Sequence, residues 1–497
     1  MSYGLENAEH PETLRRVAID PVSRVEGHGK VTILLDEDDK VRQVRLHVVE
    51  FRGFERFIQG RPYWEVPVMV QRLCGICPVS HHLAASKAMD AIVGTRRLTP
   101  TAEKVRRLMH YGQMLQSHAL HFFHLCSPDL LFGFSSDVAR RNIVGVAAAH
   151  PETARRGVLL RRFGQEVIRV TAGKRIHGTG SIPGGVNKSV TREERDVLLA
   201  DIYDILAWSR DAVALVKQLH GQDPALYNSF GVFRSSMLSL VSPGGDMDFY
   251  DGRLRARDEA GAILFDQVDY RDYHAHIREE VKPWSYMKFP FLAALGTDKG
   301  WYKVGPLARV QNCDQIPTPL ADAERREFVD YSGGAPIHAP LAYHWARMIE
   351  MLHAAETIKD LLHDDDILGD DLVSTGERAR EGIGVIEAPR GTLIHHYRVD
   401  DNDLVTMCNL IVSTTHNNQA MNEAIRHVAK RYLSGHKLTE GLLNHIEVAI
   451  RAFDPCLSCA THALGQMALE VTLVGADGGE LDRLARHGDG TTSRPAP

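Results

Sequence analysis

Two pairs of cysteines with the same spacing lie far apart in the chain, and they constrain its fold more than any other feature. The first pair is Cys74 and Cys77, in RLCGICPVSHHL, and the second is Cys456 and Cys459, in DPCLSCATH. A zinc ribbon closes four thiolates within a few tens of residues, because a small local fold is enough to bring them together. Here several hundred residues separate the two pairs. If the four sulfurs meet, the whole fold must bring them together.

The residues that flank the cysteines favour a shared site but leave the metal open. Gly75, Pro78 and Pro455 are typical of rigid turns that aim side chains at one point. Thiolates bind zinc, copper(I), iron clusters and nickel, so sulfur alone does not choose among them. Two separate redox pairs, a structural zinc clamp and buried unpaired cysteines remain alternatives at this point.

Composition points to a reducing compartment and excludes several classes of partner. Seven cysteines, three of them isolated at Cys126, Cys313 and Cys408, are too few and too uneven for a disulfide framework. Residues 1–16 do not resemble a secretory or transit peptide, and no apolar run is long enough to cross a bilayer. A net charge of -6 spread over both signs argues against nucleic acid. We therefore expect a cytoplasmic protein with no membrane span and no nucleic-acid partner.

Hydrophobic periodicity predicts long helices in the middle of the chain and strands towards both ends. Alternating apolar residues around an acidic turn predict a β-hairpin over residues 29–51, and strand-like segments return at residues 382–399 and 409–415. Helices are predicted from Thr99 towards His124, after the capping box of Thr191 and Glu194, and around residues 345–355 and 421–433. With no repeat or linker, one integrated α+β domain is the simplest interpretation.

Several motifs in the same order resemble those of one enzyme family. RLCGIC and DPCLSCATH occur together with DPVSRVEGHGK, VVEFRGFERF, SIPGGVN and EAPRG. This set resembles the large, catalytic subunit of the nickel-iron hydrogenases, over nearly the whole folded chain. FRGFERF, CGICPVSHHLA, WSYMKFP, LLHDDDILGDDLV and DPCLSCATHALGQM look most like the cytoplasmic, bidirectional, NAD-reducing type. The resemblance implies a predominantly helical α+β fold with long central helices and small peripheral sheets.

The resemblance also implies a nickel-iron centre on the four paired cysteines. Cys74, Cys77, Cys456 and Cys459 would bind nickel, and Cys77 and Cys459 would also bridge to an iron that carries cyanide and carbon monoxide. Four thiolates make nickel electron-rich, which suits heterolytic splitting of dihydrogen. A thiolate such as that of Cys459 would take the proton first.

Four further residues match positions around that centre. Glu26 resembles the proton-relay glutamate, Arg390 the arginine over the open metal position, and Asp454 the acid beside this arginine. His81 resembles the histidine that donates a hydrogen bond to a bridging sulfur. The alternatives are a Glu26 carboxylate that pairs with Arg24 or caps a turn, and a purely structural ion pair between Arg390 and Asp454.

A second cation site is implied by Glu55, the backbone carbonyl of Leu410 and His462. Oxygen donors suit magnesium, whereas the histidine leaves room for iron or manganese. One position departs from the membrane-bound members of the family: Ser117 stands where they carry an acidic residue. Proton routes copied from those enzymes are therefore in doubt here.

The chain lacks the means to carry electrons away. No cysteine run suits an iron-sulfur cluster, and no glycine-rich dinucleotide fingerprint or flavin site is recognisable. The resemblance implies a small subunit with iron-sulfur clusters, followed by a flavin-containing diaphorase that reduces NAD. The alternatives are a deazaflavin- or heterodisulfide-coupled hydrogenase, a quinone-site subunit of complex I type, which lacks these thiolates, and a zinc-clamped scaffold.

By the same resemblance the folded domain spans residues 1–462, and residues 463–497 form an extension. A dedicated endopeptidase would remove this extension after His462, once nickel-insertion factors have delivered the metal. Taken alone, LEVTLVGADGGELDRL is consistent with a hairpin followed by a short helix.

Overall fold

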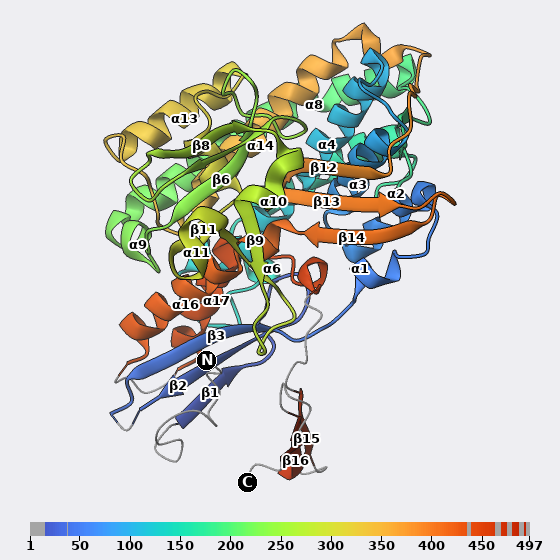
Figure 1. Cartoon of the computed structure of the whole chain (residues 1–497). Coiled ribbons are helices and arrows are strands. Elements are labelled where there is room, and N and C mark those ends of the chain that lie inside the picture. Colours follow the sequence, from blue (N-terminus) through green and yellow to red (C-terminus); the bar gives the residue numbers. More distant parts are fainter. Residues whose placement is uncertain are drawn as a thin grey trace.

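A computed structural model describes residues 15–36, 38–434, 439–462, 469–474, 480–486 and 492–493. Helices form most of the molecule, and small separate sheets lie around them (Figure 1). The predicted α+β class with long central helices is therefore confirmed. In the described part of the chain, none of the helices combines the length and the apolar character that a membrane crossing requires.

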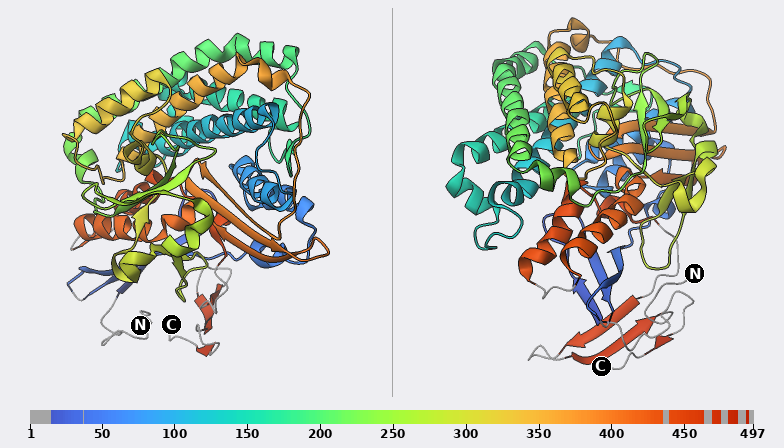
Figure 2. Two further views of the ribbon diagram at one scale, coloured as in Figure 1. Left: turned by 45° about the horizontal axis from the view of Figure 1, so that its top comes forward. Right: turned by 90° about the vertical axis from the view of Figure 1, so that its left-hand side faces the viewer.

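Four long helices pack side by side and form the largest core (Figure 2). They are α4 (Pro100–Leu120), α7 (Pro151–Ala172), α8 (Arg192–Gln222) and α14 (Ala342–Leu362). The predicted caps are present: the Thr99 side chain accepts from the backbone N–H of Ala102, and Thr191 forms its capping box with Glu194. Such a cap is worth about 1 kcal/mol.

The remaining helical segments connect these helices to the sheets. Around the first cysteine pair lie α1 (Phe54–Phe57), α2 (Val66–Met69), the 3₁₀ helix η4 (Val70–Leu73) and α3 (Pro78–Ile92). The π-helical turn η5 (His121–Cys126) extends α4 and leads into α5 (Ser127–Phe132) and α6 (Ile143–Ala149). Further along the chain lie α9 (Pro224–Ser229), α10 (Tyr273–His276), α11 (Gly296–Lys299), α12 (Pro306–Asn312), α13 (Pro319–Tyr331), α15 (Ser413–His416), α16 (Asn418–Tyr432) and α17 (Glu440–Ala452).

One antiparallel sheet carries a loop to the middle of the molecule. It consists of β12 (Glu381–Ala388), β13 (Gly391–Val399) and β14 (Val405–Ile411), which match the predicted strand segments. Helix α3 lies directly on β12. A Cβ atom on Gly382 or Gly384 would come within 2.0 Å of the carbonyl oxygens of Ala88 and Ala84. These glycines thus let α3, which follows the first cysteine pair, lie close to the β12–β13 turn.

The predicted amino-terminal hairpin is β2 (Gly29–Leu35) and β3 (Val41–Val48), and β1 (Arg15–Ile19) pairs with β2. Sequence analysis did not predict a second sheet with the order β11 (Tyr302–Lys303), β6 (Ser236–Val241), β7 (Arg253–Arg257) and β8 (Ile263–Val268). Two pairs of short strands complete the body: β4 (Ser181–Ile182) with β5 (Gly185–Val186), and β9 (Ile277–Glu280) with β10 (Phe289–Leu292).

The segment after His462 forms β15 (Leu469–Val474), β16 (Glu480–Arg486) and β17 (Thr492–Ser493). The hairpin is present, but the expected short helix is not, because residues 480–486 pair with β15 as an antiparallel strand. A seven-residue segment is too short to be a stable helix alone, so strand pairing decides its conformation. The expected cleavage point lies next to Ala463, outside the described residues.

Candidate metal centre

The first cysteine pair occupies the sharp connection between η4 and α3. Cys77 is the N-cap of α3, and Pro78 follows it at the first helical position. The backbone N–H groups of Ile76 and Cys77 donate to the Cys74 sulfur over 3.2 and 3.3 Å. From α4, the side-chain amides of Gln113 and Gln116 donate to the Ile76 carbonyl. The loop is therefore held from both sides before any metal binds.

The second pair follows α17 through a constrained turn. Asp454 has a left-handed backbone conformation with φ 55°, which only over-determined sites tolerate in a non-glycine residue. The Cys456 N–H donates to the Thr414 hydroxyl over 2.9 Å, and the Leu457 N–H donates to the Glu26 carbonyl over 2.9 Å. These bonds join the second cysteine pair to α15 and to the amino-terminal segment.

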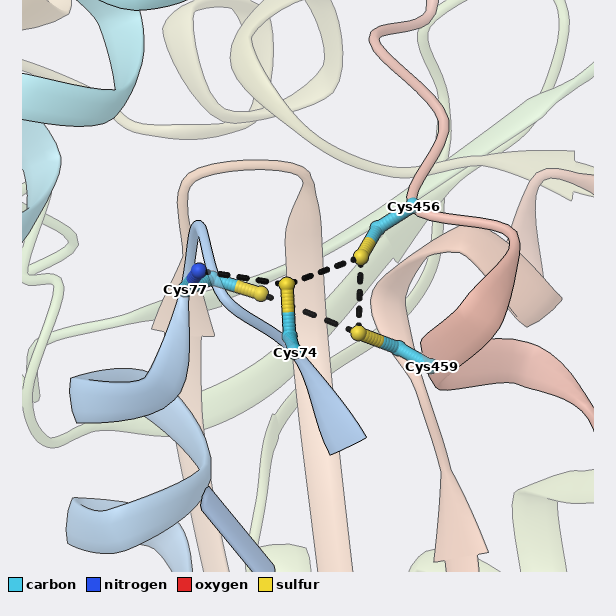
Figure 3. Close-up of side chains that lie close together, drawn as sticks. All are labelled: Cys74, Cys77, Cys456 and Cys459. Carbon is cyan, nitrogen blue, oxygen red and sulfur yellow. Dashed lines mark hydrogen bonds between the residues drawn. The ribbon is translucent and has the colours of Figure 1, made fainter. Parts of the chain in front are cut away.

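The fold brings all four predicted cysteines to one point (Figure 3). Their sulfur atoms lie within 4.8 Å of one another, and the Cys74–Cys456 and Cys456–Cys459 distances are 3.1 and 2.7 Å. All seven cysteines of the chain are buried and free. Hydrogen bonds from Cys456, Cys459 and Cys74 hold the pKa of the Cys77 thiol well below its usual value. Burial raises the pKa of the Cys456 and Cys459 thiols well above the usual value, so the cluster favours the thiolate, the form that binds metal, at Cys77.

A small cavity adjoins this cluster. Its wall contains two of the cysteines, the predicted residues His81 and Arg390, and apolar and hydroxyl side chains that sequence analysis did not predict. The lining residues are Cys77, Ser80, His81, Ala388, Pro389, Arg390, Leu393, Val412, Ser413, Thr414 and Cys456. The cavity volume of about 10 Å³ corresponds to one molecule of the size of water.

Arg390 and Asp454 form a buried ion pair at this cavity. The Arg390 Nη2 donates to the Asp454 carboxylate over 2.9 Å, and its Nη1 lies 3.5 Å from the Ser117 hydroxyl. Within the described ranges, the Arg390 Nε and one Asp454 oxygen have no hydrogen-bond partner. Burial raises the pKa of the Asp454 carboxyl to about 6, against the opposing effect of Arg390. Arg390 and Asp454 thus form the ion pair that the alternative interpretation expected. The Arg390 Nε, which has no partner among the described residues, can still donate a further hydrogen bond.

Glu26 contacts the second cysteine pair. Its carboxylate accepts from the Cys456 thiol over 3.0 Å and from the Ser458 N–H over 3.1 Å. The sulfur beside Glu26 is thus that of Cys456, whereas Cys459 is the sulfur expected to take the proton first. Glu26 is partly exposed, so it lies between the buried sulfur and the surface.

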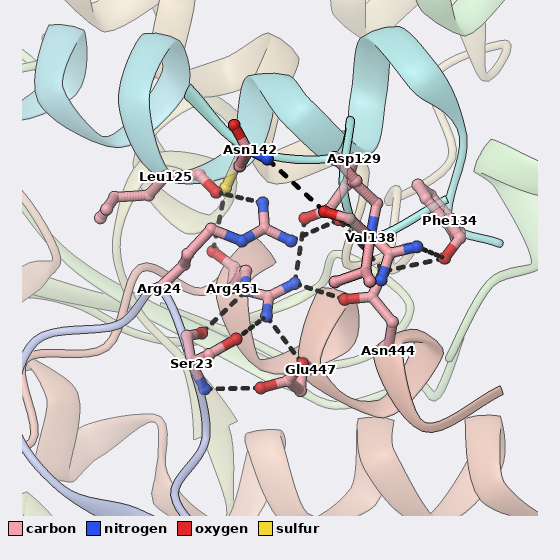
Figure 4. Close-up of polar contacts among 12 residues, drawn as sticks. Ser23, Arg24, Leu125, Asp129, Phe134, Val138, Asn142, Asn444, Glu447 and Arg451 are labelled. Carbon is pink, nitrogen blue, oxygen red and sulfur yellow. Dashed lines mark hydrogen bonds and ion pairs between the residues drawn. The ribbon is translucent and has the colours of Figure 1, made fainter. Parts of the chain in front are cut away.

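Arg24 is not the partner of Glu26; it belongs to a separate network (Figure 4). Its guanidinium donates to Asp129 over 2.6 Å, and Asp129 also accepts from Arg451 over 3.0 Å. Arg451 in turn donates to the carbonyl and the hydroxyl of Ser23. This network fixes the segment that carries Glu26 against α5 and α17. Sequence analysis missed Asp129, since nothing in the sequence brings its partners together.

His81 lies on the first turn of α3, in the wall of the cavity. Its Nδ1 is 3.1 Å from the Nε2 of His395, whose Nδ1 is 2.7 Å from the Tyr397 hydroxyl. This chain of hydrogen bonds fixes the orientation of the His81 ring. The other ring nitrogen of His81, Nε2, is thereby left to donate a hydrogen bond to a cysteine sulfur.

The residues of the predicted second cation site lie together around Lys288. The Glu55 carboxylate accepts from the Leu410 N–H over 2.8 Å and from the Lys288 ammonium over 2.9 Å. The N–H and carbonyl of a strand residue point to the same edge, so the Leu410 carbonyl also faces Glu55. Among the described residues, neither ring nitrogen of the buried His462 has a hydrogen-bond partner. Burial, with Lys288 adding to it, lowers the pKa of His462 to about 3. Sequence analysis did not predict Lys288 here.

Among the described residues, a second group of donor atoms lies within 4.8 Å of one another: His121, Cys126 and His344. The His121 Nε2 is 2.6 Å from the Arg451 carbonyl and 3.1 Å from the Cys126 sulfur. Burial raises the pKa of the Cys126 thiol to about 12. Burial, followed by the neighbouring Arg347, lowers the pKa of His121 well below its usual value. These groups are neutral and already hydrogen-bonded to the protein.

Two family models match the chain. A model described as HoxL-like matches residues 16–51, and one described as nickel-dependent hydrogenase matches residues 52–137 and 250–462. The chain belongs to the nickel-dependent hydrogenases. The four clustered cysteines, Glu55 and Arg390 all fall within the ranges matched by the second model, as does His462 at its end.

Individual relatives support this assignment. The NAD-reducing hydrogenase HoxS subunit beta of Cupriavidus necator is 48% identical over 95% of this chain and 100% of that subunit. The vhc F420-non-reducing hydrogenase of Methanococcus voltae has a subunit that is 40% identical over 94% of this chain and 99% of its own length. A crystal structure of an NAD+-reducing [NiFe]-hydrogenase in the H2-reduced state is 60% identical, with a TM-score of 0.89 over 90% of this chain and 99% of that chain. The chain is thus a hydrogenase catalytic subunit with the large-subunit fold.

Proposed function

We propose that Cys74, Cys77, Cys456 and Cys459 would hold a nickel-iron centre, in which Cys77 and Cys459 would also hold the iron with its cyanide and carbon monoxide ligands. The donor set fits this group, because four buried sulfurs converge and the wall of the adjoining cavity includes both Cys77 and Arg390. The unpartnered Arg390 Nε provides a donor for a polar diatomic ligand. Bound there, the centre supplies an electron-rich metal pair that splits dihydrogen heterolytically.

The protein's own part in that reaction is to remove a proton and to orient the cavity. The Cys456 sulfur, 3.0 Å from the Glu26 carboxylate, passes a proton to it, and the partly exposed Glu26 releases it towards the surface. Arg390, held by Asp454, presents its guanidinium to the cavity. His81 donates towards the Cys77 side, since His395 occupies its other nitrogen.

We also propose a magnesium ion on Glu55, the Leu410 carbonyl and His462. The two unpartnered nitrogens of the buried His462 support this site. Lys288 would then act as the outer neighbour of Glu55. The ion would tie the segment after the second cysteine pair to the β14 strand.

We infer that electrons leave through a small subunit with iron-sulfur clusters, from which they reach NAD through a flavin-containing diaphorase. The support is the 60% identical NAD+-reducing structure and the 48% identical NAD-reducing relative. All seven free cysteines agree with the reducing cytoplasm that this coupling requires.

Maturation completes the proposal. Residues 1–462 would form the folded catalytic domain, and an endopeptidase would remove residues 463–497 after nickel-insertion factors have loaded the metal. The match to the nickel-dependent hydrogenase model ends at residue 462, which supports this boundary.

The convergence of four sulfurs beside the Arg390 cavity is the observation that carries the proposal. The test is dihydrogen-dependent reduction of NAD by the complex purified through this chain. We expect NAD reduction and co-purification of iron-sulfur and flavin subunits. Reduction of a deazaflavin or a heterodisulfide in place of NAD would favour the alternative hydrogenase coupled to that acceptor. Dihydrogen oxidation that reduces neither NAD nor a deazaflavin would favour a type like the 40% identical F420-non-reducing relative of Methanococcus voltae.

A further inference from the structure

The turn that presents Arg390 to the cavity has an unfavourable local sequence. Ala388 pairs with Gly391, so the β12–β13 hairpin has the two-residue loop Pro389–Arg390. Two-residue loops prefer type I′ or II′ turns, which need a positive φ at the first loop residue. Proline fixes φ near −65°, so Pro389 excludes both types. The loop therefore needs support from outside the hairpin to hold Arg390 in one place.

That support comes from one buried arginine on α12. The Arg309 Nη1 donates to the Ala388 carbonyl over 2.8 Å, and its Nη2 lies 3.3 Å from the Pro389 carbonyl. Nη1 also donates to the carboxylate of Glu387, two residues before Pro389, over 2.8 Å. Arg309 therefore binds three consecutive residues of the hairpin end.

Two carboxylates fix Arg309 itself. Its Nε and Nη2 donate to the two oxygens of Glu350 on α14, over 2.7 and 2.6 Å, in a bidentate pair. Arg309, Glu350 and Glu387 are each at most 1% exposed. Glu387 is anchored further by the Leu240 N–H and the Thr392 hydroxyl, each over 2.8 Å. Lysine has three donors on a single nitrogen and could not reproduce this planar arrangement.

The same hydrogen-bond network also reaches Arg390 through helix α4. Glu350 also accepts from the His118 ring on α4 over 3.0 Å. The neighbouring Ser117 places its hydroxyl 3.5 Å from the Arg390 guanidinium. Glu350 thus links the two elements that contact Arg390, the β12–β13 turn and α4.

We propose that Arg309 is a positioning residue for dihydrogen activation: through its bonds to Glu387, Ala388 and Pro389 it sets the place of the Arg390 guanidinium over the metal cavity. This inference rests on the proposed function of the four-cysteine site. Arg309 itself does not line the cavity, so it acts through the turn residues Ala388, Pro389 and Arg390, which do.

The test compares Arg309→Lys with a matched control, Arg255→Lys, in the complete matured complex. Arg255 is also buried and binds two carboxylates and a backbone carbonyl, those of Asp266, Asp314 and Asn312, but none of its partners belongs to the turn. The measurements are the crystal structure around Arg390, the infrared bands of the diatomic ligands in the resting enzyme, and kcat.

For Arg309→Lys we expect nickel content within about twofold of wild type. The Arg390–Asp454 distance should be longer than the present 2.9 Å, and the infrared bands should shift. We expect kcat to fall by about 100-fold, the loss that a misplacement of about 1 Å causes. Arg255→Lys should leave the distance and the bands unchanged. Wild-type distance and bands in nickel-loaded Arg309→Lys would overturn the inference, and so would equal changes in both variants.

A milder variant covers the case in which Arg309→Lys fails to assemble. Glu350→Gln keeps the side-chain shape, removes the charge assistance from the bonds to Arg309 and also weakens the bond with His118, so it should shift the same bands by less. An unshifted spectrum in a loaded Glu350→Gln enzyme would contradict the proposal. A wild-type enzyme without such bands would instead refute the proposed iron ligands, and the Arg390–Asp454 distance would still decide the role of Arg309.

Discussion

Among the described residues, two buried groups of side chains carry metal-binding donor atoms. Only one of these groups has the surroundings of a metal centre. In both, the donor atoms lie within 4.8 Å of one another. The four cysteines adjoin a cavity and face the cation Arg390, which stabilises thiolates. The group of His121, Cys126 and His344 lies next to Arg347. None of these three residues lines the cavity, and two of the three donors are neutral imidazoles rather than sulfur.

Hydrogen bonding separates the two groups in the same way. The His121 Nε2 is held by the Arg451 carbonyl, so this nitrogen would have to give up its proton to bind a metal. The Cys456 thiol has Glu26 beside it to accept its proton. Proximity of donors therefore does not define a metal site; an acceptor for the released protons and open space do.

The largest expected effect follows loss of a sulfur from the four-cysteine site. Cys459→Ser should abolish dihydrogen oxidation, because an alcohol with a far higher pKa cannot replace a thiolate that holds two metals. The check is a dihydrogen uptake assay with nickel analysis of the purified complex. Near-normal nickel content and turnover in this variant would contradict the site.

The second-largest effect on turnover is expected for Glu26→Gln. The amide keeps the shape of the side chain but cannot accept a proton from Cys456, so turnover should fall by about 10²–10⁴-fold with nickel retained. A steady-state assay and metal analysis on the same sample decide it. An equal loss in Arg24→Lys, which touches Asp129 rather than Cys456, would show that the segment matters only as structure.

Arg390→Lys should cost about 100-fold in turnover, because lysine keeps the charge but loses the planar donors. Nickel content should stay normal, since Arg390 binds no metal in this account. Turnover of the wild-type size would reduce Arg390 to a structural partner of Asp454.

The smallest effect is expected in the second group. Cys126→Ser should leave nickel content and turnover within about twofold of wild type, because serine retains a hydrogen bond to the neighbouring groups; the cost in stability should be about 1 kcal/mol. Thermal unfolding and uptake assays measure both, with Cys313→Ser as the isolated-cysteine control. Loss of nickel in Cys126→Ser alone would show that the second group takes part in the metal chemistry.

The sequence allowed prediction of the residues that carry chemistry in local motifs, and less of those that position them. The CxxC spacing and the motifs located all four cysteines, and the Thr191 capping box located α8. Helix α7 was missed because its N-cap, His150, makes no side-chain cap. Asp129 and Arg309 were missed for a different reason. Their partners come from distant elements, so no local spacing reveals them.

X-ray absorption at the nickel edge of the matured complex tests the central claim most directly. The account predicts one nickel per chain, surrounded by sulfur from four cysteines, with unchanged surroundings in Cys126→Ser. Nickel absent from the chain, zinc in its place, or nickel bound mainly by nitrogen and oxygen would contradict it.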